Sequence, residues 1–522
     1  MSRATQTALV RDDRTVYEAV AGSAVGVSGV AFALGLAALL DVVAIDESVA
    51  GIELSVAFGV LLLALGTAVV GFGVTSRLAY VDTNPQPSAG IVAAVAFTAV
   101  WFAAGAVAAG AWGLGTVGRL GAGAVLGGIG FATTAFPRED IGSTAPAGAI
   151  AGLFGLLLGG GVVGPGWEQV LTGYNATLFG DTVVPVVVLF ASLVTGWSAA
   201  KAYGGFGARG RNVGAYVLIY LVVGSILTVL VGLVAFVTVK GLPGLFNGFD
   251  VGGAGLVRWP FLTNGAGLLA DIAGVFPALM GTIWLVVGAV LFAVPTGVGA
   301  AVFLSEYAEQ GRFTGAVEVA TNGLWSTPSI VFGLFGAAFL IPRFGNQKSL
   351  IAGMLTLGFM LLPLVLITSR EAILAVPDDY RDASAALGVS KWQTIRSVVL
   401  PAAIPGVTTG VILGVGRIAG ETAPILLTMG GGVLPARSAA PDVLGGFRLS
   451  ASPPFVSNPA LLEATSALPY QLYALITAGL SGNIRNPQEY AWGLALTLLL
   501  VVLVFYAIGI ATRYYFRRKL HQ

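Results

Sequence analysis

Twelve long apolar segments run through the sequence and constrain its fold more than any other feature. A helix needs about 20 mostly apolar residues to cross the hydrocarbon core of a bilayer. Nine segments meet this requirement clearly, and they are 19–40, 54–75, 89–111, 146–164, 182–200, 215–239, 276–304, 351–368 and 490–512. Three more, at 120–135, 323–341 and 405–428, are shorter or contain polar residues. We therefore predict an all-α, polytopic membrane protein with about 12 transmembrane helices.

The composition excludes several other classes of protein. Only 10% of the 522 residues are charged and the mean hydropathy is +0.89, whereas a soluble domain carries roughly 25% charged residues. The chain has no cysteine and His521 is its only histidine, which excludes disulfides, thiol catalysis and zinc sites built on these residues. The 26 Lys and Arg balance the 25 Asp and Glu, so charge gives no indication of nucleic-acid binding. We expect no metal, no cofactor and no nucleic acid, with membrane lipid around the chain.

The distribution of basic residues predicts the orientation in the membrane. With the N-terminus in the cytoplasm, the inner segments hold 17 Lys and Arg and the outer segments hold 8. This is the bias of the positive-inside rule, and basic residues at both ends fit an even number of spans. No cleavable signal peptide is expected, because the first apolar run lacks a small-residue cleavage site. Arginine outnumbers lysine 21 to 5, which favours a GC-rich prokaryote, so we predict a prokaryotic cell membrane with both termini cytoplasmic.

The basic, glycine-rich segment 201–214 separates six predicted spans from six others. We therefore predict two domains, a six-span N-terminal extension at 1–205 and a second membrane domain at 206–522. In the extension, charged residues such as those at 138–140 are expected in loops, and the spans offer no convincing ionisable side chain. A packing or scaffolding role is favoured for this half, and sensing or regulation is the alternative. Asn175 begins an N-x-T triplet in a predicted outer loop, where glycosylation is possible.

Repeated glycines indicate close helix contacts in the N-terminal half. Four of them fall within the predicted span 120–135, at Gly121, Gly123, Gly127 and Gly128. Without a side chain, such residues let two helix backbones approach closely in lipid. We expect the helix at 120–135 to pack tightly against a neighbour.

The longest predicted cytoplasmic loop, 369–403, has a helical pattern of its own. Pro377 is followed by Asp378 and Asp379, a typical helix start with acids placed where the helix dipole favours them. Gly388 interrupts the pattern, and Trp392 begins a second helical face before the chain returns to the membrane. The loop is thus predicted to form two short helices with an exposed apolar face, which needs a partner protein to cover it.

This loop resembles the EAA loop of ABC-importer permeases. The matching residues are Asp382, Ala383, Ser384, Gly388, Leu400 and Pro401. The family pattern begins Glu-Ala-Ala, so Asp382 keeps the charge and Ser384 keeps the small size. The resemblance implies that Asp382, Ala383 and Ser384 dock into an ATPase subunit and that Gly388 makes the turn.

Other segments are similar to the phosphate-specific permeases of the PstA type. They include WSTPSIVFGL at 325–334, GETAP at 420–424 and LPY at 468–470. The resemblance extends over 206–522 and implies a six-helix permease core that translocates inorganic phosphate. It also implies three partners: a second permease of the PstC type, a dimer of PstB-type ATPases and an extracytoplasmic phosphate-binding protein of the PstS type.

Two charged residues lie within the predicted span 405–428. Arg417 and Glu421 are four residues apart and so share one face of a helix. An isolated charge at a helix centre costs about 2.5–3.5 kcal/mol on insertion scales, and pairing lowers this cost. The pair is either a structural ion pair or, as the resemblance favours, a site where Arg417 binds the phosphate oxyanion and Glu421 holds the arginine. Thr422 offers a further hydroxyl, although such hydroxyls usually bind backbone carbonyls.

Thr327 and Ser329 flank Pro328 at the entry of another predicted span. Proline frees backbone groups at such a position, and breaks of this kind often line a pathway. A simple helix kink with locally satisfied hydroxyls is an equal alternative. The substrate-pathway candidates are therefore Arg417, Glu421, Thr422, Thr327 and Ser329.

The chain is not expected to be an enzyme. It contains no GxxxxGK[ST] pattern, so ATP hydrolysis by that route would belong to a separate subunit. The leading hypothesis is the permease subunit of an ABC importer for phosphate. The alternatives are a permease for another oxyanion, such as sulfate, molybdate or phosphonate, and a stand-alone secondary transporter with two repeats.

Overall fold

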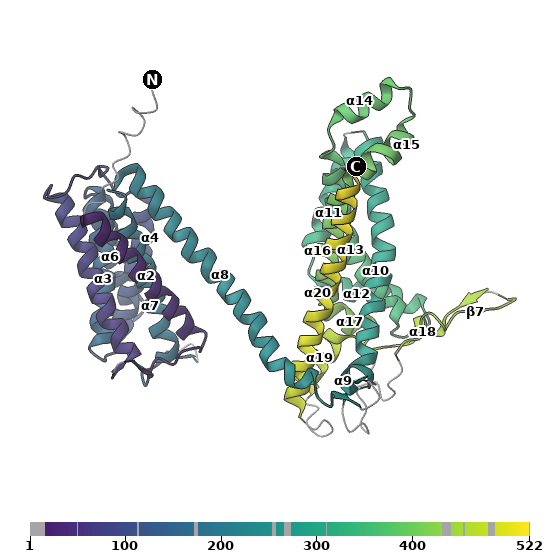
Figure 1. Cartoon of the computed structure of the whole chain (residues 1–522), viewed down its shortest axis with the longest axis horizontal. Coiled ribbons are helices and arrows are strands. Elements are labelled where there is room, and N and C mark those ends of the chain that lie inside the picture. Colours follow the sequence, from purple (N-terminus) through teal and green to yellow (C-terminus); the bar gives the residue numbers. More distant parts are fainter. Residues whose placement is uncertain are drawn as a thin grey trace. The chain divides into compact units, whose positions relative to one another are not determined.

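The computed structural model is almost entirely helical, which confirms the predicted all-α class (Figure 1). It describes residues 16–49, 51–111, 114–171, 176–252, 257–265, 273–309, 311–430, 440–452, 455–478 and 486–520. Within these ranges the strands form four two-stranded antiparallel hairpins, all in connections between helices. Asn175 of the N-x-T triplet lies outside the described residues.

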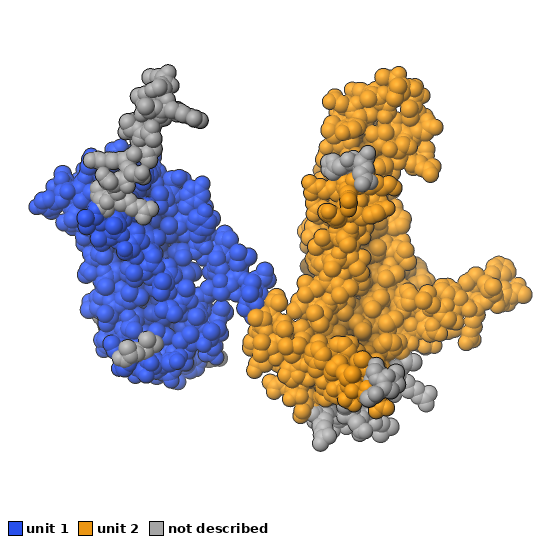
Figure 2. Space-filling view, in the orientation of Figure 1, with its two compact units in different colours: residues 1–232 blue, residues 233–522 orange. Residues whose placement is uncertain are grey.

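The chain forms two compact units, unit 1 at 1–232 and unit 2 at 233–522 (Figure 2). Helix α8 (Gly207–Leu245) contributes residues to both units. Each unit has hydrophobic clusters of its own, such as the one around Phe58 and Leu62 in unit 1 and the one around Leu357 and Val365 in unit 2.

Unit 1 is a helical bundle with two hairpins. Its elements are α2 (Val16–Leu39), β1 (Ser48–Val49), β2 (Ile52–Glu53), α3 (Leu54–Arg77), α4 (Ile91–Ala111), α5 (Thr116–Ala135), α6 (Glu139–Gly159), β3 (Glu168–Leu171), β4 (Ala176–Phe179), α7 (Gly180–Tyr203) and the first part of α8. β1 pairs with β2 and β3 pairs with β4, so each hairpin closes the connection between two helices.

Glycines bring the helices of unit 1 into backbone contact. A Cβ on Gly59 of α3 would overlap the backbone of Gly159 in α6, and one on Gly66 would lie 2.9 Å from the carbonyl oxygen of Gly148. In α5, a Cβ on Gly123 would lie 2.9 Å from the carbonyl oxygen of Phe102 in α4. The expected tight contact of α5 is therefore present on one side of this helix.

Only two of the four glycines in the predicted span 120–135 take part in this contact with α4. Gly127 also faces α4, where a Cβ would lie 3.1 Å from the carbonyl oxygen of Thr98. No described atom lies within 4 Å of a Cβ built on Gly121 or Gly128. These two glycines point away from the neighbour because positions one or two residues apart in a helix do not share a face.

Unit 2 consists of long and short helices with two short hairpins. After α8 follow β5 (Asp250–Val251), β6 (Val257–Arg258), α9 (Pro260–Thr263), α10 (Phe276–Val302), η1 (Phe303–Tyr307), α11 (Arg312–Ser326), α12 (Ser329–Phe335), η2 (Gly336–Leu340), η3 (Ile341–Arg343) and α13 (Leu350–Leu374). The chain continues with α14 (Asp378–Ala386), α15 (Lys391–Thr394), η4 (Ile395–Val399), α16 (Leu400–Ala419), α17 (Ala423–Thr428), β7 (Arg448–Leu449), β8 (Val456–Ser457), α18 (Pro459–Leu462), α19 (Leu468–Ala478) and α20 (Pro487–Leu520).

The long helices of unit 2 give it two distinct ends. Helices α14 and α15 lie at one end, and α9 and α19 lie at the other (Figure 1). Between them α10 and α13 pack along their length, and α16 packs on α13 and α20. Leu285, Leu357 and Ile418 are almost completely buried in this core.

The number of spans is close to the prediction. Among the described residues, nine helices are long and apolar enough to cross a membrane, and the bent pair α11–α12 makes ten. The other two predicted segments, 89–111 and 120–135, form α4 and α5. α4 counts only as a shorter apolar helix over its described part, and α5 is rich in glycine and threonine.

One sequence expectation about unit 1 is wrong. Glu139 and Asp140 do not lie in a loop but form the first turn of α6, and both are completely buried. Lys201 lies in the last turn of α7 and is also buried, so the predicted break at 201–214 shrinks to residues 204–206. A charge can be buried when it has a partner, and the partners of Glu139 come from segments that are distant in the sequence. The local sequence pattern therefore could not show that Glu139 is buried.

The backbone contact between α3 and α6 leads to a test of stability. Replacing Gly59 by Ala adds a methyl group against the backbone of α6, and such overpacking typically costs about 1–3 kcal/mol. Gly71→Ala is the matched control, because no described atom lies within 4 Å of its Cβ. We expect thermal unfolding in detergent to begin at a lower temperature for Gly59→Ala and at an unchanged or slightly higher one for Gly71→Ala. Equal midpoints would show that the helices do not pack as described.

Candidate functional site

The Arg417 guanidinium is held by one contact from helix α11 and one from the break that follows α16. Arg417 lies in the last turn of α16, and its Nε is 3.8 Å from Oε1 of Glu421. Its Cζ lies 4.5 Å from the centre of the Trp325 ring, which belongs to α11. The Arg417 side chain is 35% exposed and that of Glu421 17%. A carboxylate and an aromatic face thus fix the guanidinium while leaving part of it accessible.

This pair sits near one end of α16 rather than at its centre. Arg417 follows Leu400 by 17 residues, which corresponds to about 26 Å along a helix. α16 ends at Ala419, and the backbone N–H of Glu421 still donates to the carbonyl of Ile418 at 3.3 Å. The pair predicted from the four-residue spacing therefore forms across the end of the helix.

Two helices are interrupted side by side close to this pair. α11 and α12 meet at a bend of 104° around Thr327 and Pro328. α16 and α17 are separated by residues 420–422, and α12 packs against α17. The approach is close, because a Cβ on Gly333 of α12 would lie 3.0 Å from Cα of Pro424. Interrupted helices with free backbone groups are typical of substrate sites in transporters.

The hydroxyl groups of this region form mostly local contacts. Thr327 Oγ1 donates to the carbonyl of Gly323 at 2.8 Å, and Thr428 Oγ1 donates to that of Pro424 at 2.8 Å. Ser329 is the first residue of α12 and Thr422 immediately precedes α17. Thr327 also lines an apolar pocket of 320 Å³. The Thr327 hydroxyl is therefore satisfied by the backbone of its own helix, as expected for a simple helix kink.

The loop between α13 and α16 folds into two short helices, α14 and α15. Asp382 and Ala383 are exposed on α14, whereas Ser384 is buried. Gly388 follows with a φ of +75°, a left-handed conformation that glycine adopts without steric cost. Leu400 and Pro401, both half-buried, begin α16. The loop thus presents its acidic residue outward and turns at the glycine.

Apolar side chains extend the exposed face of this loop. Leu387 is 82% exposed and Trp392 54%, and both flank the turn at Gly388. Exposed apolar groups on a protein surface commonly mark a binding site for another protein. This face at one end of unit 2 is suited to dock a separate protein (Figure 1).

An ion pair that we did not predict ties this loop to the end of α10. Arg381 of α14 binds Glu306 of η1 through two hydrogen bonds, with Nη2 at 2.9 Å and Nε at 3.2 Å from Oε1. The Glu306 side chain is only 8% exposed. Arg381 also donates to the carbonyls of Val376 and Ile373, at 2.7 and 3.0 Å. One arginine therefore joins α14, the end of α13 and the end of α10.

A second cation strengthens the same junction. The Lys391 ammonium donates to the backbone carbonyl of Glu306 and lies 5.1 Å from the centre of the Tyr307 ring. Glu306 thus receives contacts from both helices of the loop. Arg381 directly precedes Asp382, but its partner lies 75 residues away, so no local spacing could predict the pair.

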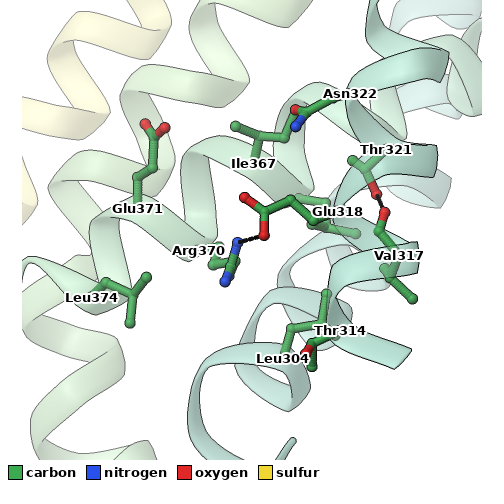
Figure 3. A pocket seen from close by; sticks show the side chains of 11 residues that line it. Leu304, Thr314, Val317, Glu318, Thr321, Asn322, Ile367, Arg370, Glu371 and Leu374 are labelled. Carbon is green, nitrogen blue, oxygen red and sulfur yellow. Dashed lines mark hydrogen bonds and ion pairs between the residues drawn. The ribbon is translucent and has the colours of Figure 1, made fainter. Parts of the chain in front are cut away.

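A small polar pocket lies between η1, α11 and α13 (Figure 3). Its volume is 190 Å³, and Glu318 and Arg370 face each other across it with Nη1 3.5 Å from Oε2. Glu371 and Leu374, seven and four residues before Asp378, also line it. The pocket is lined by two carboxylates, those of Glu318 and Glu371, and by one guanidinium, that of Arg370. It is therefore poorly suited to bind an anion.

Unit 1 contains a separate buried charge cluster. Lys201 Nζ lies 2.8 Å from Oε1 of Glu139, and the other oxygen of Glu139 accepts the backbone N–H groups of Gln86 and Gly207, each at 3.0 Å. Asp140 accepts a hydrogen bond from Nε of Arg138 at 2.9 Å, which raises the pKa of Arg138 above its usual value. This cluster joins α6, α7, the start of α8 and the connection before α4.

Comparison with known proteins identifies the family of the chain. Residues 293–522 match the model of the binding-protein-dependent transport system inner membrane component. A probable ABC transporter permease protein, YqgI of Bacillus subtilis, is 36% identical over 199 residues, which cover 38% of this chain and 68% of the relative. The phosphate transport system permease protein PstA of Mycobacterium leprae is 36% identical over 251 residues, covering 47% of this chain and 72% of the relative. The chain belongs to this family of ABC-importer permeases.

Family membership confirms the prediction made from the EAA-type loop and the neighbouring segments. The permease is a multi-pass membrane component of a binding-protein-dependent transport system. A solved structure of the MetNI methionine ABC transporter, in an inward-facing conformation, is also similar, with a TM-score of 0.34 and 18% identity over 47% of this chain and 94% of that chain. The family model begins at residue 293, within α10, so it does not include unit 1.

The Glu306–Arg381 pair leads to a test of the loop in this permease. Glu306→Gln removes a charge-assisted contact of a buried carboxylate, an interaction typically worth about 1.5–3 kcal/mol. We expect ATP-driven transport by the assembled complex to fall about tenfold or more, with an unchanged amount of protein in the membrane. Glu309→Gln is the matched control, since Glu309 is exposed and only three residues away. Equal transport by the two variants would show that the anchor is not needed.

Proposed function

We propose that this permease carries inorganic phosphate across the membrane and that Arg417 lies in the translocation pathway. The observation that supports this most directly is a partly exposed guanidinium fixed beside two interrupted helices. A guanidinium presents a planar set of donors that matches the oxygens of a phosphate ion. The relative from Mycobacterium leprae, which is named as a phosphate transport system permease, supports phosphate as the substrate.

Glu421 has two roles in this proposal. Its carboxylate balances the charge of Arg417 when no substrate is present, which reduces the cost of a charge near lipid. The distance of 3.8 Å is longer than a direct hydrogen bond, so the pair is loose and the guanidinium can exchange the carboxylate for phosphate. Trp325 keeps the guanidinium in position during this exchange, because the ring contact does not depend on Glu421.

Transport by this chain requires a separate source of energy. The exposed face of residues 378–399, with Asp382, Ala383, Leu387 and Trp392, provides a docking surface for an ATPase subunit. Motion of the ATPase would reach the membrane helices through Arg381 and Glu306, which join the loop to α10. This assignment places the loop and both termini in the cytoplasm, as the basic residues favour.

The complete importer in this proposal has four kinds of subunit. Besides this chain it contains a second permease, a dimer of ATPases and an extracytoplasmic phosphate-binding protein. The family description already names a binding-protein-dependent system, and a single EAA-type loop in this chain supports a second permease. Unit 1 is assigned a scaffolding role, because its buried charges Glu139, Asp140 and Lys201 are paired within the unit.

Uptake of labelled phosphate by phosphate-starved cells tests this proposal. We expect deletion of the gene to remove high-affinity uptake and Arg417→Ala to reduce it by about 10- to 100-fold, the loss expected for a charge-assisted hydrogen bond of about 1.5–3 kcal/mol. Arg417→Lys keeps the charge but not the planar fork and is expected to recover only part of the uptake.

Two controls make the result specific. Arg343→Ala removes another exposed arginine of unit 2, which also lies on an aromatic ring, with its Cζ 3.6 Å from the centre of Phe339. Its uptake is expected to equal that of the unmodified chain. Excess sulfate is expected to leave uptake unchanged. Inhibition by sulfate would instead assign another oxyanion, and equal losses in both arginine variants would remove Arg417 from the pathway.

A further inference from the structure

Unit 1 contains an apolar pocket of 460 Å³ between α4, α7 and the start of α8. Such a volume is typical of sites that bind small organic molecules. α7 lines it from Phe190 to Lys201 and α4 from Val92 to Val100, and α8 adds Ala215 and Leu218. Most of the lining side chains are aliphatic or aromatic, so an occupant must be largely apolar.

One end of this pocket is positively charged. Lys201 and Arg211 line it there, on either side of the turn at 204–206 that joins α7 to α8. Both cations are close to Glu139, with Lys201 Nζ at 2.8 Å and Arg211 Nη1 at 3.7 Å from its oxygens. The single carboxylate of Glu139 thus faces two cations, and its contact with Arg211 is the weaker of the two.

The remaining charged groups of the cluster do not cancel this excess. Asp140 is paired with Arg138, whose hydrogen bond to it measures 2.9 Å. The Arg211 side chain is 47% exposed, whereas Lys201 and Glu139 are buried. Among the described residues of this cluster, the unbalanced positive charge therefore belongs to Arg211 at the mouth of the pocket.

The dimensions of the pocket match one leaflet of a bilayer. Phe190 and Lys201 are 11 residues apart on α7, which corresponds to about 16 Å along the helix axis. Half of a hydrocarbon core of about 30 Å is about 15 Å. The charged end lies where α7 ends and α8 begins, and such a turn between two spans lies at a membrane surface.

We propose that this pocket binds an anionic phospholipid, with an acyl chain between α4, α7 and α8 and the phosphate of the headgroup on Arg211. Basic pockets between transmembrane helices at a membrane surface are suited to such headgroups. The bound lipid would link α4 to the start of α8, the helix that continues into unit 2. The acyl chain would also cover the side chain of Trp197, which packs against Lys201 with Nζ 4.8 Å from its ring centre.

Lipid binding can be measured on the full-length chain purified in detergent. Native mass spectrometry and thermal unfolding are recorded after addition of an anionic phospholipid, a zwitterionic phospholipid of the same chain length, or inorganic phosphate. We expect the anionic lipid alone to remain bound and to raise the unfolding temperature. Arg211→Gln is expected to weaken its binding about fivefold, the effect of about one basic side chain near a membrane surface.

Two further variants separate the headgroup from the acyl chain. Arg209→Gln is the matched control, because Arg209 is 69% exposed on the same helix but does not line the pocket. Its binding is expected to be unchanged. Ala96→Phe fills the apolar part from an exposed position of α4 and is expected to abolish binding without affecting the fold. Equal binding of both lipids, unchanged binding in Arg211→Gln or Ala96→Phe, or an equal shift with phosphate alone would overturn the proposal.

Discussion

No water reaches the hydrocarbon core of a bilayer, so every backbone N–H and C=O group there must be satisfied within the protein. Continuous helices meet this requirement, and the long spans of both units follow from it. A broken helix does not, because it frees backbone groups at the break. At the breaks at 327–328 and 420–422 the fold therefore departs from continuous helices. They occur side by side and next to Arg417, which makes this region the best candidate for contact with substrate.

Charged side chains in this permease act mainly through fixed partners. Arg417 is held by Glu421 and Trp325, and Arg381 is held by Glu306 and backbone carbonyls. In each case one long side chain connects segments that are separate in the sequence. Such contacts can transmit movement, since a displaced loop must carry its anchored helix with it. The same principle in unit 1 yields a buried, hydrogen-bonded cluster around Glu139.

The sequence was sufficient to predict features that depend on local patterns. Each of the twelve apolar segments predicted from the sequence is helical, although two of them contain a break, and the four-residue spacing placed Arg417 beside Glu421. Features that depend on distant partners were not predictable in this way. Glu139 and Lys201 are 62 positions apart, so Glu139 looked like a loop residue. The contact of Trp325 with Arg417 was hidden for the same reason, although Trp325 lies in a segment singled out by resemblance and Arg417 was singled out as a charge within a predicted span.

We propose that phosphate passes beside Arg417, and access to this position can be measured chemically. The chain has no cysteine, so Thr422→Cys, next to Glu421, introduces a single thiol into it. The variant is assembled with its partner subunits in lipid vesicles and treated with a water-soluble thiol reagent, and labelling of this chain is followed by mass spectrometry. If phosphate passes beside Arg417, phosphate is expected to slow the labelling of this thiol and sulfate is expected to leave it unchanged. A thiol that is never labelled, or is labelled equally with and without phosphate, would contradict it.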